Sequence, residues 1–149
     1  MYAFVDRPVE SLSNSGRFLL WAMRGWVQAA TRGACPPQAL HRGFAGVRAL
    51  AALPDFHVAM ALIAADAHYS LEVAPMPCPR IAEDEAVLLG LWRDMSRHDG
   101  DHARATLALL VEPGAIAPVV HAMDAALAGL ASAGFDLSSF SPRMKHQDN

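Results

Sequence analysis

The sequence predicts an all-α fold, a compact bundle of about five to six helices joined by short connections, and three observations support this. The chain has 149 residues, the length of one domain, so we treat 1–149 as a single helical domain with an irregular arm at 1–13 and a polar tail at 138–149. Its 29 alanines far outnumber its 15 valines, isoleucines and threonines, which favours helix over sheet. Proline and glycine divide it into segments with apolar residues at helical spacing. With 53% hydrophobic residues and 2 cysteines, it is neither a disordered chain nor a disulfide scaffold.

The first predicted helix covers residues 15–31. Ser13 or Asn14 is its expected N-cap, because both side chains can accept a hydrogen bond from the first turn. Gly33 lies just past its expected end, where glycine adopts the left-handed conformation without strain. Apolar side chains cover most of the circumference of this segment, so we expect other helices almost to surround it.

The second and third predicted helices cover residues 37–53 and 56–71. The second begins at a Pro-Pro pair, a position where the missing N–H costs nothing, and we expect Pro54 to end it. Asp55 can cap the third helix. Because the third segment is apolar around most of its circumference, we expect it at the centre of the bundle.

Residues 74–80 alternate with proline and predict a stiff, extended connection. Three further helices are expected at 83–97, 102–111 and 115–133. Gly134 is the expected C-cap residue of the last of these.

Charge is divided unevenly along the chain. Residues 1–54 hold six arginines and two acids, a net charge of +4, and residues 55–149 carry −7. One interpretation is a surface for phosphate or an acidic partner. Its candidate residues are Arg17, Arg24, Arg42 and Arg48. The alternative is that the basic and acidic helices meet within a monomer or across a dimer. Net acidity and the lack of helix-turn-helix spacing argue against nucleic-acid binding.

The run from His98 to His102 offers metal ligands, because two imidazoles four residues apart on one helix can reach the same ion. Glycine and aspartate inside the run also fit a junction between helices. In that interpretation Asp99 or Asp101 is an N-cap and both histidines are exposed. The second interpretation is favoured, and no cofactor is expected.

Glu85 lies towards the apolar side of its predicted helix, where a buried carboxylate could act as a ligand or a base. It also occupies the third helical position after Ala82, from which its side chain can accept the N-cap amide. A ligand site would combine Glu85 with neighbours at the same end of the bundle. Its candidate residues are Cys78, Arg80, Glu85, Asp66 and His68.

Three stretches of the sequence, 78–81, 84–89 and 17–24, resemble a family of short, alanine-rich bacterial proteins of unknown function. In that family a Cys-Pro-Arg stretch precedes a Thr or Ser cap and an Asp-Glu-Ala helix start, and here Ala82 stands at the cap position. The resemblance implies an all-helical fold and implies no activity.

The sequence favours a non-enzymatic binding or interaction module with no catalytic residues. It is expected to form a homodimer, because apolar helix faces exceed what a small bundle can bury. The alternative is a protein that binds a metal or a small ligand at the Cys78-Pro79-Arg80 connection, with Glu85 and His68. We expect a cytoplasmic protein without a membrane segment, because the uninterrupted apolar stretches are short and the N-terminus lacks a signal pattern.

Overall fold

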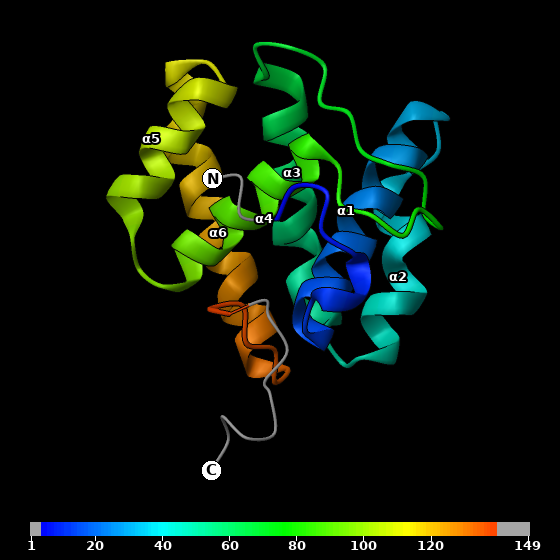
Figure 1. Cartoon of the computed structure of the whole chain (residues 1–149). Coiled ribbons are helices and arrows are strands. Elements are labelled where there is room, and N and C mark those ends of the chain that lie inside the picture. The colour runs from blue at the N-terminus through cyan, green and yellow to red at the C-terminus, as the bar shows by residue number, and fades with distance from the viewer. Residues whose placement is uncertain (1–3, 140–149) are drawn as a thin grey trace.

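The computed structural model describes residues 4–139, and these form six α-helices and two short 3₁₀ helices (Figure 1). The elements in order are η1 (Val9–Ser11), α1 (Asn14–Thr31), α2 (Pro36–Gly46), η2 (Leu50–Ala52), α3 (Leu53–Asp66), α4 (Glu83–Ser96), α5 (Gly100–Leu110) and α6 (Pro113–Ser132). Pairing of the β type is limited, over this part of the chain, to isolated bridges at Pro8–Arg80 and Ala67–Val111. The predicted all-α class is confirmed. Residues 1–3 of the predicted arm and 140–149 of the predicted tail lie outside the described residues.

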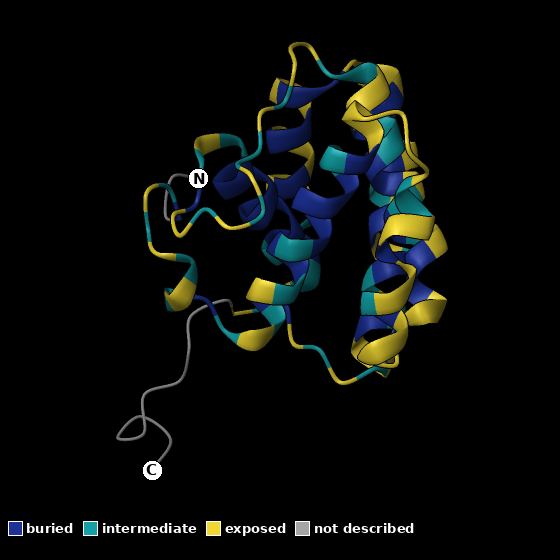
Figure 2. Cartoon of the chain, turned by 90° about the vertical axis from the view of Figure 1, so that its right-hand side faces the viewer, coloured by how far each residue is buried: buried dark blue, intermediate teal, exposed yellow. Residues whose placement is uncertain are grey.

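Helix α4 lies at the centre of the bundle, between α1 on one side and α5 and α6 on the other (Figure 1). It buries ten of its 14 residues. The expectation that the third helix would be central is wrong, because α3 exposes 45% of Val58 and buries one face, chiefly against α6. Buried residues lie on the helix faces that turn towards the inside of the bundle and exposed ones on the outer faces (Figure 2).

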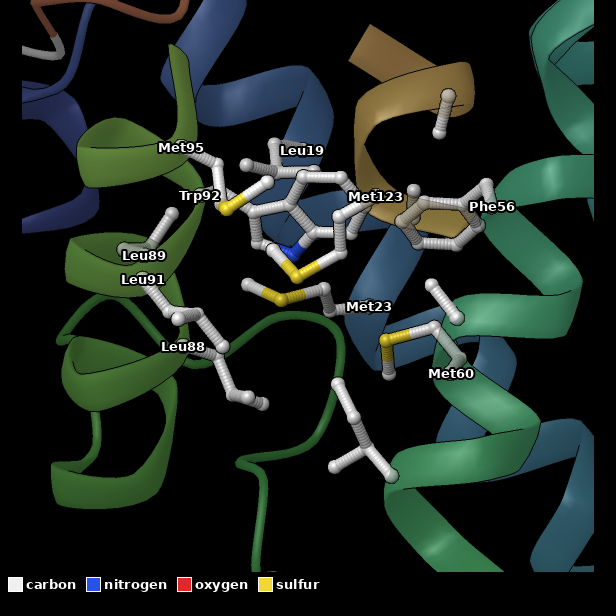
Figure 3. Close-up of a cluster of buried hydrophobic side chains, with 14 of the residues drawn as sticks. Leu19, Met23, Phe56, Met60, Leu88, Leu89, Leu91, Trp92, Met95 and Met123 are labelled. Carbon is white, nitrogen blue, oxygen red and sulfur yellow. The ribbon is translucent and has the colours of Figure 1, made fainter. Parts of the chain in front are cut away.

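The core is built around Trp92 of α4, which is fully buried (Figure 3). Its ring stacks on Phe56 of α3 at a centroid distance of 5.7 Å. Methionines from α1, α4 and α6 surround it: Met23, Met95 and Met123. Four helices therefore meet at this one side chain.

Four helices end in the same way, in the Schellman motif, in which the residue after the C-cap is left-handed. At α1 and α6 that residue is glycine, Gly33 with φ 75° and Gly134 with φ 96°, as predicted. At α2 and α4 it is Arg48 with φ 61° and His98 with φ 60°. The predicted helix 37–53 is therefore too long, since α2 ends at Gly46 and the chain turns at Arg48.

The start of α3 also differs from the prediction. Pro54 lies in the first turn of α3 instead of ending the preceding helix, and the N-cap is Ala52, whose methyl side chain makes no cap hydrogen bond. Asp55 is in the first turn and is not the cap. The helix ends at Asp66, five residues before the expected end, because the backbone of residues 66–68 pairs with the α5–α6 junction.

Helix α6 is the longest helix of the described part of the chain, and Pro118 lies within it. It alone among the helices at 4–139 has the length and the apolar composition to cross a membrane, and 33% of its apolar window is buried. In this structure it packs against α3, α4 and α5.

Gly129 sets the distance between α6 and η2. A Cβ atom added there would lie 2.9 Å from the Cβ of Ala52 and 3.0 Å from its Cα, and this backbone cannot move freely. Gly129→Ala is therefore expected to lower the free energy of unfolding by about 1–3 kcal/mol through overpacking. Urea unfolding measures the change.

Gly90 in α4 provides the matched control, because nothing lies within 4 Å of its added Cβ. Gly90→Ala should raise the free energy of unfolding by about 0.5–1 kcal/mol, the usual gain of alanine over glycine in a helix. Equal effects of the two substitutions would contradict the close approach at Gly129.

Candidate functional site

A buried ion pair joins α1 to the first turn of α4. Arg24 and Glu85 are 3% and 0% exposed. The Arg24 Nε donates to Glu85 Oε2 at 2.7 Å, and its Nη2 donates to Oε1 at 3.0 Å, so the pair is bidentate. Bidentate geometry is the form in which arginine and a carboxylate bind most strongly.

The same pair fastens residues 67–82, the connection between α3 and α4, which we call the strap. The remaining N–H groups of Arg24 donate to the carbonyls of Met76, Cys78 and Arg80 at 3.1, 2.9 and 2.9 Å. All five guanidinium donors are therefore engaged.

Glu85 holds the strap from the other side. Its Oε2 accepts from the backbone N–H of Ala74 at 2.9 Å, and its Oε1 accepts from that of Ala82 at 2.8 Å. The second bond confirms the predicted capping contact of Glu85. The strap crosses α1 and returns to α4 (Figure 1), and the Arg24–Glu85 pair fixes this path through its hydrogen bonds to the strap backbone.

A cavity of about 350 Å³ lies between the C-terminal halves of α1 and α3 and the beginning of the strap. Nine of its lining residues are apolar, and three, at its edge, carry hydroxyl groups. The apolar residues are Trp26, Val27, Ala30, Met60, Ile63, Ala64, Ala67, Leu71 and Leu88, and the others are Thr31, Tyr69 and Ser70. Apolar walls with a few polar groups are typical of small-molecule sites.

The wall of this cavity contains a side-chain hydrogen bond. The Trp26 indole N–H donates to His57 Nδ1 at 2.9 Å, and the two rings lie 6.0 Å apart between centroids. An indole N–H can only donate, so the imidazole accepts at Nδ1. The bond fixes the orientation of the largest side chain in the cavity wall.

A second hollow of about 230 Å³ lies where the strap crosses α1. It shares Val27 and Thr31 with the first cavity, so the two adjoin along the last turns of α1. Arg32 and Gln28 contribute polar groups, and Val73 and Met76 of the strap contribute apolar ones. The strap therefore borders both of these hollows, the first through Ala67 and residues 69–71 and the second through residues 73–76.

The five residues of the predicted ligand site do not form one cluster, although Cys78, Arg80 and Glu85 all contact Arg24. Glu85 is occupied by Arg24, and the Cys78 thiol lies 3.5 Å from the carbonyl of Arg80. Arg80 is exposed and donates to the carbonyl of Asp6. His68 faces Glu112 at 3.6 Å at the other end of the strap, next to Asp66, whose backbone carbonyl accepts from Glu112. The cysteines are both free thiols.

One of the four arginines of the predicted surface is buried. Arg17, Arg42 and Arg48 are exposed, whereas Arg24 is buried with every donor engaged. At helical spacing Arg24 shares a narrow polar stripe of α1 with Arg17, Gln28 and Thr31, and α4 and the strap cover this stripe only at Arg24. Two features of the sequence could have indicated the buried pair. Arg24 lies on a helix predicted to be surrounded, and Glu85 lies on the apolar side of another predicted helix.

The two predicted metal-site histidines lie on either side of the turn that starts α5, so they do not share one continuous helix. His98 is the left-handed residue after the C-cap of α4, and His102 lies in the first turn of α5, with Asp99 as its N-cap. His102 Nδ1 lies 2.6 Å from Oδ2 of Asp94, a buried residue that the sequence reasoning did not select. Asp94, Asp99 and His102 form the one group of three potential metal ligands found within residues 4–139.

Comparison with known proteins gave no match to any family model, curated protein or solved structure. The resemblance to alanine-rich bacterial proteins therefore stays a prediction.

Proposed function

We propose that this protein is a binding module whose ligand is a small, mainly apolar molecule held in the cavity between α1, α3 and the strap. The observation that carries the proposal is the cavity itself, about 350 Å³ in volume and walled mostly by apolar side chains. Ligand pockets commonly fall between roughly 300 and 1,000 Å³. This volume fits a small molecule of up to about three rings or a short aliphatic chain.

Two further features support binding at this place. The hydroxyl groups of Thr31, Tyr69 and Ser70 lie at the edge of the cavity, where they can orient a polar end of the ligand. The cavity wall is rigid where Trp26 bonds His57, and the Arg24–Glu85 pair fastens the strap beyond the cavity. A pre-formed site loses little conformational entropy on binding.

The neutral apolar dye N-phenyl-1-naphthylamine tests the proposal by fluorescence titration. We expect saturable binding of one dye per chain and a change in the NMR resonance of the Trp26 indole N–H. The Trp92 indole N–H does not line the cavity and should change less. Dye binding that leaves the Trp26 resonance unchanged would contradict the proposal.

Ala64→Phe should block the cavity, because Ala64 lines it from α3 and a phenyl group would occupy the space of the ligand. We expect the dye affinity to fall by about tenfold or more, equivalent to roughly 1.4 kcal/mol. Ala65→Phe is the matched control, since Ala65 is equally exposed on the same helix and is absent from the cavity wall. If both variants bind the dye like the parent protein, the site is elsewhere.

Self-association is a second proposal. It is supported by Leu109 and Tyr69, which are 64% and 48% exposed and line the same small hollow beside α4 and α5. Exposed apolar side chains that lie together favour contact with another surface. Size-exclusion chromatography with light scattering should show a species of twice the 16.0 kDa chain mass, and a monomer at every concentration would contradict it.

A further inference from the structure

We propose that the junction between α4 and α5 is a divalent metal site, in which Asp94, Asp99 and His102 bind Zn²⁺. One potential ligand atom of each residue lies within 4.8 Å of the others. Two carboxylates and an imidazole are a ligand set that zinc accepts, and three protein ligands leave a fourth position for water or substrate. This site lies apart from the cavity under the strap.

The Schellman motif at the end of α4 brings the two carboxylates together. Its hydrogen bonds run from Asp99 N to the carbonyl of Asp94 and from His98 N to that of Met95. The residues at the two aspartate positions usually make an apolar contact. In the three other motifs of the described chain both positions hold apolar residues: Ala29 and Ala34, Phe44 and Ala49, and Leu130 and Phe135. Only at α4 do two like charges take these positions, where they repel unless a positive charge lies between them.

The buried carboxylate of Asp94 has one partner at hydrogen-bond distance among residues 4–139, the imidazole of His102. Asp94 is 6% exposed, and within residues 4–139 no hydrogen bond from outside the cluster reaches its side chain. The neighbouring Arg93 does not supply one, because its Nε lies 3.9 Å from Asp94 Oδ1 and its guanidinium lies over the ring of Phe4. A carboxylate removed from water requires compensation, and a metal ion directed at its free lone pairs provides it.

The geometry allows an ion to enter with a small movement. His102 Nδ1 and Asp94 Oδ2 are 2.6 Å apart, whereas two ligands of a tetrahedral zinc ion with bonds of 2.0–2.1 Å are about 3.3 Å apart. The side chain of His102 is 50% exposed and can rotate outward by this amount, while the buried Asp94 stays in place. Asp99 and His102 are exposed, so an ion can reach the site from solvent.

The test is calorimetric titration of the untagged protein with ZnCl₂, compared with the His102→Gln variant. We expect one Zn²⁺ per chain, with an affinity at least about tenfold lower in the variant. His98→Gln is the matched control, because His98 is exposed, lies four residues away and is outside the cluster. Asp99→Asn should weaken Zn²⁺ binding like His102→Gln, and Asp101→Asn is its matched control, because Asp101 is exposed and outside the cluster. Both controls should bind within twofold of the parent protein.

Cobalt gives a second readout that separates this site from the cysteines. Co²⁺ bound by two carboxylates and an imidazole absorbs in the visible range without the thiolate-to-cobalt charge-transfer band that Cys35 or Cys78 would add. A charge-transfer band would overturn the assignment, and so would equal affinity in His102→Gln and the parent protein. The second result would leave the cluster as a histidine–aspartate ion pair only.

Discussion

Glu85→Ala should lower the free energy of unfolding by about 3–5 kcal/mol, the range for breaking a buried ion pair from one side. The variant leaves the Arg24 guanidinium 3% exposed without its counter-charge. It also leaves the backbone N–H groups of Ala74 and Ala82 without their acceptor. Each loss adds to the cost, because a buried or part-buried donor without a partner is unfavourable.

Glu83→Ala is the matched control, and urea unfolding measures the free energy of unfolding of both variants. Glu83 is exposed in the same first turn of α4, so its removal costs only its interaction with the helix dipole, about 0.3–1 kcal/mol. If Glu85→Ala is destabilised as little as Glu83→Ala, the ion pair is not formed in solution.

Removing both partners separates the pair from the strap. Arg24→Met with Glu85→Leu eliminates both buried charges, so this double variant should be less destabilised than the sum of the two single variants. It cannot restore the bonds to the strap, because methionine donates to none of the carbonyls of Met76, Cys78 and Arg80. Faster hydrogen exchange at Ala74 and Ala82 is expected in the double variant even where its stability recovers.

The sequence predicted the helix ends that glycine marks, but it placed the ends of α2 and α3 several residues too late. Gly33 and Gly134 indicated the ends of α1 and α6, because glycine adopts a positive φ without strain. Arg48 and His98 adopt the same conformation, but arginine and histidine do not indicate a positive φ in the sequence. The error at Arg48 made the second helix too long, and the turn at His98 separated the predicted histidine pair.

The candidate sites depended on contacts between distant segments. Arg24 and Glu85 are 61 residues apart, so the polar stripe of α1 and the apolar side of α4 could be predicted separately but not paired. The cavity has no motif at all, since its walls come from α1, α3, α4 and the strap. For the metal cluster, the sequence selected His102 and Asp99. It missed Asp94, which joins them only because α4 ends two residues later.

Trp92→Ala should also lower the free energy of unfolding by about 3–5 kcal/mol, since it removes the largest fully buried side chain. The cavity it leaves would lie between four helices, where Phe56, Met23 and Met123 all lose a packing partner (Figure 3). Because α1, α3, α4 and α6 meet there, collapse of the cavity would require whole helices to shift. Chemical unfolding measures the loss.

Trp92→Phe separates the packing of Trp92 from its polar atom. The indole Nε1 is buried and has no hydrogen-bond partner among the residues at 4–139, so the parent protein carries the cost of a desolvated donor. Phenylalanine removes that donor, keeps a ring against Phe56 and leaves a smaller cavity. The two effects oppose each other, and the variant should lose about 1 kcal/mol or less. A loss as large as that of Trp92→Ala would show that the indole N–H bonds a partner in solution and that the polar atom contributes more than the packing.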